Sequence, residues 1–271
     1  MRCAARRSVV QYGRFPLAMA MLPHDLLDLG QSFKRYFEIV PAMTEELRRE
    51  AFRIRHEVYC EELGYEPLRA DGLETDDYDR QSLHCLIRSV ATGAYAGCTR
   101  LVLTRSDDPS QLLPFEKVCA GRLDLSVLDP QALPRRSVAE VSRLAVISQY
   151  RARRGEATMQ APLSEESLDA GSSRPRFPYI TVGLYLGTIE LAALHGVQTL
   201  FVLTEPRLAR QFARLGVDVE RIGREVDHRG MRVPSMLRVA SILNGLNFVV
   251  RPLYEVIAQE VRLALQEVVA A

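Results

Sequence analysis

Apolar and polar positions alternate along this chain with two different periods, and their order predicts a mixture of helices and strands. After Thr44, a residue type that favours helix N-caps, apolar residues recur at intervals of three and four as far as about Glu62, which predicts an amphipathic helix. Residues 84–90 and 95–104 are strand-like and are joined by a short turn with a glycine, which predicts a β-hairpin. Residues 138–147 are apolar at most positions and predict a buried strand.

The remaining segments continue this mixed pattern to the C-terminus. Residues 179–195 form a strongly apolar run of helical length that Gly196 ends. Pro206 suits the first turn of another helix, because proline lacks an N–H that the first turn does not need. We also expect helices at 24–30 (ended by Gly30), 206–215 and 254–269, a helical turn at 115–119, and strands at 36–40, 199–203, 217–222 and 231–240.

This order of elements predicts an α/β (α+β) protein with a mixed sheet, and no repeat or compositional break demands a second domain. We expect residues 1–34 to form a tail with a short helix, 35–241 the main domain and 242–271 a helical C-terminal extension. Within the main domain, residues 148–178 are first basic and then rich in polar residues, glycine and proline. They predict an exposed insertion that is longer than most loops.

Composition excludes several classes of protein. Among 271 residues, 47% are hydrophobic and 25% are charged, and the net charge of +1 offers no global field for nucleic acid or a membrane surface. Five cysteines without metal-ligand spacing predict reduced core thiols in a cytoplasmic protein and no metal site. Arg14, Pro16 and Pro23 interrupt the apolar residues near the N-terminus, so we expect neither a secretory signal nor a membrane span.

Two charged residues, Glu140 and Arg143, stand inside the apolar run at 138–147. Burying them is costly unless they are paired or hydrogen-bonded. They are either a structural ion pair or a catalytic carboxylate with an arginine that anchors substrate. Regular strand alternation places residues three apart on opposite faces, so one substrate meets both only at a strand end or a bulge.

Three earlier segments carry further candidate residues in a fixed order. Arg55 and Tyr59 lie on the first long helix and Tyr65 follows it, the acidic segment ETDDYD spans residues 74–79, and GCTRL spans residues 97–101. With the strand that follows, this order resembles the autoinducer-synthase-like branch of the GNAT acyltransferases over residues 37–240. The pattern of acyl-homoserine-lactone synthases is matched at Arg55, Tyr59, Tyr65, Asp76, Asp79, Arg100, Glu140 and Arg143.

The later half is similar to PEP-CTERM/exosortase system-associated acyltransferases, which group with the N-acyl amino acid synthases. This similarity lies in TEP at 204–206, FARLG at 212–216, Ile222-Gly223, HRG at 228–230 and Pro234. The main departure from homoserine-lactone synthases is aromatic, because Tyr59 and Tyr65 stand where phenylalanine and tryptophan are usual and the chain contains no tryptophan.

The resemblance implies a GNAT-like acyl-CoA N-acyltransferase fold with a central splayed sheet, and it suggests roles for the matched residues. Glu140 is the candidate general base, because an ammonium becomes nucleophilic only after it loses a proton; its alternative is a structural partner of a nearby arginine. Arg143 and Arg100 suit an acceptor carboxylate. Alternatively, Arg100 binds Asp76 or Asp79 and only orders the acidic loop. We favour such a scaffold role for Asp79. For Asp76 two roles stay open, a structural one and binding of the acceptor's ammonium group.

Other roles follow from the same resemblance. Arg55 is expected near the acyl-donor cleft, or else as a solvated helix residue, and the two tyrosines either bind substrate or only pack. The backbone of Leu144, Ala145 and Val146 is the expected source of oxyanion donors. The role of His84 is left open, because it could be either a core residue or part of the site. Residues 179–195 form either a simply buried helix or one wall of an acyl-chain site, where Gly183 and Gly187 leave room.

The turn after the central strand lacks the glycine-rich sequence that usually binds coenzyme A pyrophosphate in GNAT proteins. Its basic residues are Arg151, Arg153 and Arg154. They suit an acidic carrier protein with a phosphopantetheine arm, although a solvated basic loop is the ordinary alternative.

We therefore predict an N-acyltransferase that moves a long-chain fatty acyl group from acyl-carrier protein (or acyl-CoA) to the α-amine of an amino acid. The attack is direct and assisted by a general base, and the only co-substrate is an acyl-phosphopantetheine thioester, without a permanently bound cofactor or a nucleic acid partner. Membrane contact is limited to peripheral contact through the lipid product. The alternatives are an acyl-homoserine-lactone synthase that uses S-adenosylmethionine and a non-catalytic acyl-carrier or lipid-binding module.

Overall fold

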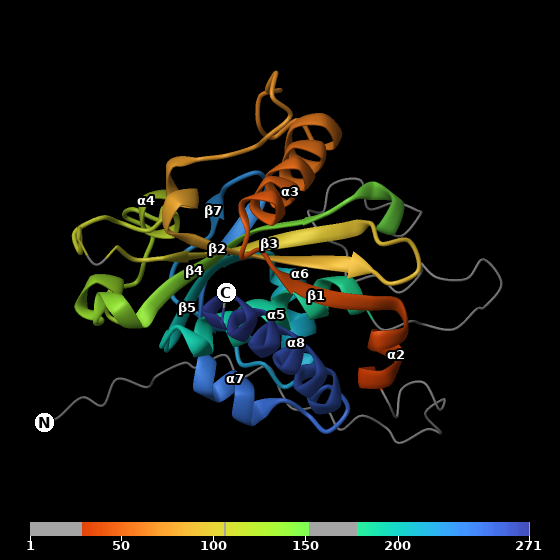
Figure 1. Ribbon diagram of the computed structural model, residues 1–271. Helices are drawn as coiled ribbons and strands as arrows, with labels where there is room; N and C mark the ends of the chain where they lie inside the picture. The colour runs from red at the N-terminus through yellow and green to blue at the C-terminus, as the bar shows by residue number, and fades with distance from the viewer. Residues whose placement is uncertain (1–28, 106, 152–177, 271) are drawn as a thin grey trace, which may run out of the picture.

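A computed structural model describes residues 29–105, 107–151 and 178–270, and its centre is a mixed sheet in the order β1-β2-β3-β4-β5-β8-β6, with β7 paired to β8 (Figure 1). All neighbouring strands are antiparallel except β4 and β5. The strands are β1 (Phe37–Pro41), β2 (Ser82–Ser89), β3 (Tyr95–Leu103), β4 (Val138–Val146), β5 (Thr199–Thr204), β6 (Glu220–Arg221), β7 (Val226–Asp227) and β8 (Met231–Arg238).

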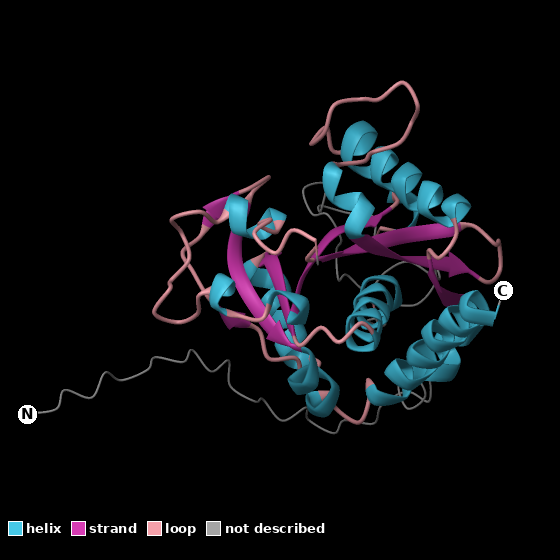
Figure 2. Cartoon of the chain, turned by 60° about the vertical axis from the view of Figure 1, so that its left-hand side comes forward, coloured by secondary structure: helices cyan, strands magenta, loops and turns pink. Residues whose placement is uncertain are grey.

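Helices cover both faces of this sheet, which confirms the predicted fold class (Figures 1 and 2). One face carries α3 and α4, and the other carries α5, α8 and α2. The α-helices are α2 (Leu29–Tyr36), α3 (Glu45–Arg55), α4 (Pro114–Val118), α5 (Tyr179–Leu194), α6 (Pro206–Arg214), α7 (Val239–Gly245) and α8 (Arg251–Ala270). A π-helical segment, His56–Glu62, continues α3.

Most of the predicted elements are confirmed within one to three residues. Thr44 is the N-cap of α3, and its side chain accepts a hydrogen bond from the N–H of Leu47 at 3.3 Å. The hairpin, the central strand and the turn at α4 also lie where the hydrophobic pattern predicts them. The structure adds β7 and α7, which are too short to show a periodic pattern.

The prediction that a helix ends at Gly30 was wrong, because α2 runs through this glycine. A Cβ atom at Gly30 would lie 2.8 Å from the carbonyl oxygen of Pro252, so glycine here permits close packing of α2 against α8. The glycines of α5 serve the same purpose: a Cβ at Gly187 would lie 2.8 Å from Cys85 Sγ. The space beside Gly183 and Gly187 is therefore filled by protein atoms.

The largest hydrophobic core lies between the sheet and the helices α2, α5 and α8. Leu29 and Phe33 of α2 and Ile257 and Val261 of α8 are part of it, so both ends of the described chain pack on the main sheet. Two smaller cores lie on the opposite face, one under α3 and one around Phe115 of α4. The division into tail, main domain and C-terminal extension stays a prediction.

The sheet is splayed at its centre, as predicted. β4 and β5 pair over only three positions, from Val138↔Thr199 to Glu140↔Phe201, and the remainder of β4 diverges from β5. Glu140 is thus the last residue of β4 that pairs with β5, at the point where these two strands separate.

Candidate active site

A β-bulge interrupts β4 directly after the splay begins. The register between β3 and β4 shifts between Cys98 and Arg100, and opposite this shift Arg143 adopts a left-handed backbone with φ of +54°. A non-glycine residue in this region is uncommon and marks a strained position, of the kind that clusters at functional sites. The bulge changes the alternation of side chains that a regular strand would impose.

As a result, Arg143 reaches the same face of the sheet as Glu140. Glu140 and Ser142 are two residues apart before the bulge and share a face, and Arg100 donates to Ser142 Oγ at 3.3 Å. Asp76 accepts hydrogen bonds from Arg100 at 2.7 Å and from Arg143 at 3.2 Å. The geometric condition for one shared site, which a regular strand would have failed, is met.

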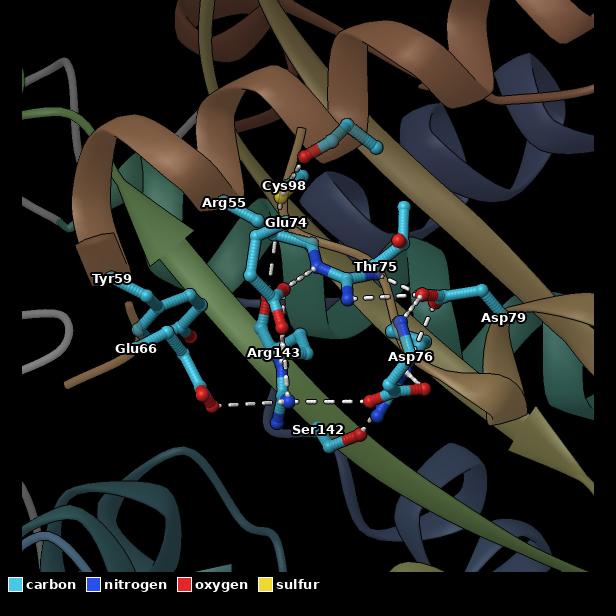
Figure 3. A network of polar contacts seen from close by, with 12 residues as sticks. Arg55, Tyr59, Glu66, Glu74, Thr75, Asp76, Asp79, Cys98, Ser142 and Arg143 are labelled. Atoms are coloured by element: carbon cyan, nitrogen blue, oxygen red, sulfur yellow. Dashed lines mark hydrogen bonds and ion pairs between the residues drawn. The ribbon is translucent and has the colours of Figure 1, made fainter. Parts of the chain in front are cut away.

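Glu74 stands at the centre of a buried ion-pair network beside the bulge (Figure 3). It accepts hydrogen bonds from Arg55 Nε at 2.5 Å and from Arg143 Nη2 at 3.2 Å. Arg55 also donates to both carboxylate oxygens of Asp79, at 2.6 and 3.1 Å. Burial opposes the ionisation of Glu74, but the guanidinium groups of Arg55 and Arg143 outweigh it and lower the pKa of Glu74 to about 2.

Arg55 is wholly buried in this network, which excludes the solvated helix residue that was the alternative. Its hydrogen bonds connect α3 to the acidic loop, at Glu74 and Asp79. A buried guanidinium must be paired, and this one is paired on both edges.

The acidic loop is ordered from within and by Arg100. Asp76 and Asp79 form a reciprocal capping box, in which Asp76 accepts from the N–H of Tyr78 and Asp79 accepts from the N–H of Asp76. Arg100 donates to both carboxylates, at 2.7 and 2.9 Å, so the structure contains the scaffold contacts expected for Asp79. Asp76 differs because 28% of its side chain is exposed, compared with 8% for Asp79. Asp76 is thus the member of the pair that faces solvent.

Glu140 has a different environment from these paired acids. Its Oε2 atom accepts a hydrogen bond from the backbone N–H of Phe115 at 2.6 Å, and among the described residues no group donates to Oε1. Burial raises the pKa of Glu140 to about 7, and the hydrogen bond from Phe115 and the charges of Arg100 and Arg143 limit the rise. Glu140 forms no salt bridge within the described chain, so its contacts there do not support the structural ion-pair alternative.

Of the two tyrosines, Tyr59 contacts the bulge directly. Tyr59 is buried, and its hydroxyl donates to the carbonyl oxygen of Leu144 at 2.7 Å, while its ring lies under the guanidinium of Arg143. Tyr65 packs in the same small core, with Arg229 over its ring. Tyr59 therefore contacts the bulge directly through Leu144 and Arg143, in addition to packing in the core that contains Cys98 and Ala145.

The expected oxyanion donors, Leu144, Ala145 and Val146, lie on the part of β4 that diverges from β5. On the opposite face of the sheet, below this divergence, β4 and β5 and the helices α5, α6 and α7 enclose an apolar cavity of about 30 Å³. Its lining includes Val141, Tyr185, Leu186, Ile189, Val202, Phe212 and Leu237. Such a volume corresponds to about one water molecule.

The basic turn after β4 is described only in part. Arg151 forms an ion pair with Glu62 and is mostly buried, so its charge is already partnered. Arg153 and Arg154, and most of the predicted insertion, lie outside the described residues. The contact of this turn with a carrier protein or phosphopantetheine stays a prediction.

Several residues of the site have no recognisable sequence signal. Glu74 belongs to the acidic segment, but nothing local separates it from its exposed neighbours. Glu66 pairs with both Arg143 and Arg229, which places the β7–β8 turn beside the site. His84 is buried against Phe52, 3.6 Å from Asp79, and burial lowers its pKa to about 3, so it is neutral at pH 7.

In the described part of the chain, four cysteines are free and buried, namely Cys60, Cys85, Cys98 and Cys119. Within the described ranges no group of three or more His, Cys, Asp and Glu side chains is arranged to hold a metal ion. None of the described helices is both long enough and apolar enough to span a membrane.

Comparison with known proteins connects this geometry to acyl transfer. Residues 54–161 match the family described as "Acetyltransferase (GNAT) domain". The acyl-homoserine-lactone synthase of Pseudomonas fluorescens is 24% identical over 196 residues, which cover 71% of this chain and 80% of that protein.

Two solved structures share the fold. The acyl-homoserine-lactone synthase LasI matches with a TM-score of 0.52 and 18% identity over 79% of this chain and 98% of its own. The coenzyme A-dependent acyl-homoserine-lactone synthase BjaI, with SAM and isopentyl-CoA, matches with a TM-score of 0.51 and 17% identity over 84% of this chain and 89% of its own. This chain is an acyltransferase whose residues 54–161 match the GNAT domain, and its relatives include acyl-homoserine-lactone synthases.

Proposed function

We propose that this acyltransferase moves a fatty acyl group from a phosphopantetheine thioester to the α-amine of an amino acid, with Glu140 as general base. The observation that carries the proposal is the environment of Glu140. It is buried, its pKa is raised to about 7, and one carboxylate oxygen has no donor among the described residues. A general base works best with a pKa near the working pH and a lone pair directed to its substrate.

The acceptor would lie across the solvent-facing part of the network. Asp76 offers a partly exposed carboxylate to the ammonium group. The Nε and Nη2 atoms of Arg143 donate hydrogen bonds to Glu74 and Asp76. Among the described residues no group accepts a hydrogen bond from its Nη1. This nitrogen suits the acceptor carboxylate, because a guanidinium recognises carboxylates through its peripheral N–H groups.

In the proposed reaction the acceptor ammonium gives a proton to Glu140, directly or through a water molecule. The freed amine attacks the thioester carbonyl, forming a carbon–nitrogen bond and a tetrahedral oxyanion. Backbone N–H groups of Leu144, Ala145 and Val146 are the proposed donors to this oxyanion. Its collapse breaks the carbon–sulfur bond, and the leaving thiolate takes up the proton that the attacking nitrogen loses. No covalent acyl-enzyme forms.

The apolar cavity beside the splay supports binding of the acyl chain. Its walls come from both separated strands, through Val141 of β4 and Val202 of β5, and from α5 through Tyr185 and Ile189. At about 30 Å³ it holds about one water molecule, so a chain enters only when lining side chains move. Phe212, whose ring packs edge-on against Tyr185, is one of these lining residues.

The donor is proposed to be acyl-carrier protein or acyl-CoA, without a permanently bound cofactor. BjaI, which shares the fold, is described with isopentyl-CoA, which supports a phosphopantetheine thioester as the donor. The kinship with PEP-CTERM/exosortase-associated acyltransferases also stays a prediction, and a neighbouring exosortase gene would support it.

A second candidate function is synthesis of an acyl-homoserine lactone from S-adenosylmethionine. It is favoured by the homologue from Pseudomonas fluorescens and by the SAM described with BjaI. S-adenosylmethionine is itself an α-amino acid, so the contacts proposed for Asp76 and Arg143 serve either acceptor. The tyrosines at positions 59 and 65 favour the amino acid product, because they replace the aromatic residues usual in the lactone synthases.

Mass spectrometry of the products separates these functions. The purified protein is incubated with acyl-carrier protein thioesters and with acyl-CoA of several chain lengths, together with an amino acid pool or S-adenosylmethionine. An N-acyl amino acid is the expected product. A lactone with S-adenosylmethionine would establish the second function instead, and binding of thioester without turnover would leave only a non-catalytic module.

A further inference from the structure

A short helix outside the ion-pair network supplies the only hydrogen bond that Glu140 receives from the described residues. Phe115 is near the start of α4, where backbone N–H groups have no partner within the helix, and its N–H reaches Glu140 Oε2 at 2.6 Å. The Phe115 ring stacks on Phe201 at 5.0 Å, and Phe201 is the β5 residue paired with Glu140. The position of α4 therefore sets the environment of the proposed base.

A five-residue helix has little stability of its own, because helix nucleation is costly and few hydrogen bonds follow it. α4 is instead held by a buried carboxylate in its first turn. Glu116 Oε2 accepts a hydrogen bond from the N–H of Leu113 at 2.7 Å, which fixes the residue that precedes the helix. Only 5% of Glu116 is exposed, and it does not contact the ion-pair network.

Arg135 completes this support from another part of the chain. It donates to both oxygens of Glu116, at 2.9 and 2.7 Å, and to the carbonyl oxygen of Gln111 at 3.1 Å. Its own carbonyl oxygen accepts from Thr104 Oγ1 at 2.6 Å, which ties the segment before β4 to the end of β3. A bidentate arginine–carboxylate pair fixes orientation as well as distance. Neither residue contacts the proposed acceptor surface.

The loop before α4 is also tied to the acidic loop. The hydroxyl of Tyr78, inside the turn that Asp76 caps, donates to the carbonyl oxygen of Leu112 at 2.8 Å, and Lys117 lies over the Tyr78 ring. The N-terminal end of α4 is thereby fixed from two sides.

We propose that Glu116 and Arg135 are positioning residues, whose bidentate pair holds the Phe115 N–H against Glu140 and keeps that carboxyl group ready to act as base. This inference rests on the proposed function for its catalytic meaning, but the hydrogen bond and its support exist independently of any reaction. Burial raises the pKa of Glu140, and the Phe115 N–H is the largest influence that opposes the rise. When α4 is loosened, the carboxylate loses this donor and its pKa increases further.

The test uses Glu116→Ala and Arg135→Gln, with Glu190→Gln as the matched control. Glu190 is also a buried carboxylate with an arginine partner, Arg262, but it lies on α5 on the opposite face of the sheet. In protein labelled with ¹³C at glutamate carboxyl carbons, the Glu140 signal is identified as the one that Glu140→Gln removes. Its titration then reports the pKa of Glu140 directly.

We expect Glu116→Ala to raise the pKa of Glu140 by about one unit, the size of one hydrogen bond to a charged group, and Arg135→Gln to raise it by less. The acid limb of the kcat profile should move upward by the same amount, while the rate at high pH stays within about twofold. Glu190→Gln should move neither. If Glu116→Ala does not fold, Arg135→Gln, which keeps the Glu116–Leu113 hydrogen bond, is decisive by itself.

The proposal is overturned if the pKa of Glu140 stays within about 0.2 unit of the wild-type value in the Glu116 and Arg135 variants, or if Glu190→Gln shifts it equally. The carboxyl titration needs no turnover. If the Glu116 and Arg135 variants raise the pKa of Glu140 as expected but the wild-type protein forms no acyl product, the proposed function is rejected and the positioning role is retained. If the wild-type protein forms the acyl product but the variants do not shift the pKa of Glu140, the positioning role is rejected and the proposed function is retained.

Discussion

Glu74 and Glu140 are both buried glutamates on the same face of one sheet, yet their pKa values are shifted in opposite directions. Glu74 is contacted by two guanidinium groups, and its pKa is lowered to about 2. Glu140 is contacted by one backbone N–H, and its pKa is raised to about 7. Since both groups are buried, the number and charge of their hydrogen-bond donors decide which carboxyl group stays ionised at neutral pH.

This difference separates structural from chemical roles in the site. A carboxylate that remains ionised down to about pH 2 does not take up a proton from an amine near neutral pH, so Glu74 orders Arg55 and Arg143 and does not act as a base. Glu140 exchanges its proton near pH 7, at the point where β4 and β5 separate.

Glu74→Ala should destabilise the protein by ~3–5 kcal/mol, the range for breaking a buried ion pair from one side. The wholly buried guanidinium of Arg55 would retain only Asp79, and Arg143 would lose one of the two carboxylates that lie 3.2 Å from its Nη2. Urea unfolding measures the change. Glu50→Ala is the control, since Glu50 forms an exposed pair with Arg53, and it should cost less than ~1 kcal/mol. A similar small loss for Glu74→Ala would contradict a central role for Glu74.

Glu140→Gln should lower the rate of acyl transfer about a hundredfold or more, because the amide cannot accept the proton of the ammonium. Its stability should be unchanged or higher at pH 7, since the amide carries no charge to bury and still accepts from Phe115. Steady-state kinetics and urea unfolding provide both values. Glu190→Gln, far from the site, is the kinetic control. Unchanged turnover in Glu140→Gln would remove Glu140 from the role of base.

The two carboxyl groups should contribute oppositely to the pH dependence of stability. The pKa of Glu74 is lowered on folding, so its contribution is complete above about pH 5 and is lost as the pH falls towards 2. The pKa of Glu140 is raised, so its contribution is complete below about pH 4 and is lost as the pH rises through about 7.

Thermal melting from pH 3 to 8 measures this contrast. In Glu140→Gln the loss of stability between about pH 5 and 7 should be reduced, while the loss in acid remains. An identical pH profile for wild type and Glu140→Gln would show that Glu140 does not titrate in that range.

Tyr59→Phe should have the smallest effect, a loss of about 1 kcal/mol, because it removes the hydrogen bond to Leu144 and keeps the buried ring. Tyr59→Leu removes the ring as well and should cost more, which separates packing from hydrogen bonding. Urea unfolding measures both. No loss in Tyr59→Phe would show that the hydroxyl does not support the bulge.

Much of the fold follows from local pattern. The Thr44 cap, the hairpin of β2 and β3 and the bounds of β4 were all predicted, because capping, turn chemistry and hydrophobic period act over a few residues. The resemblance also selected residues that the structure brings together, among them Arg55, Asp79 and Arg100. It did not select Glu74, whose partners lie 19 and 69 residues away along the chain.

By itself, then, the sequence determined which segments are helices and strands and which residue types are available for acyl transfer. Only the tertiary structure decided that Arg143 turns onto the face of Glu140, since this depends on a bulge between two strands far apart in sequence. It also decided which buried carboxyl group has a pKa near 7. The reason is physical: a carboxyl group's pKa depends on every donor and charge that packs against it, and those come from separate segments of the chain.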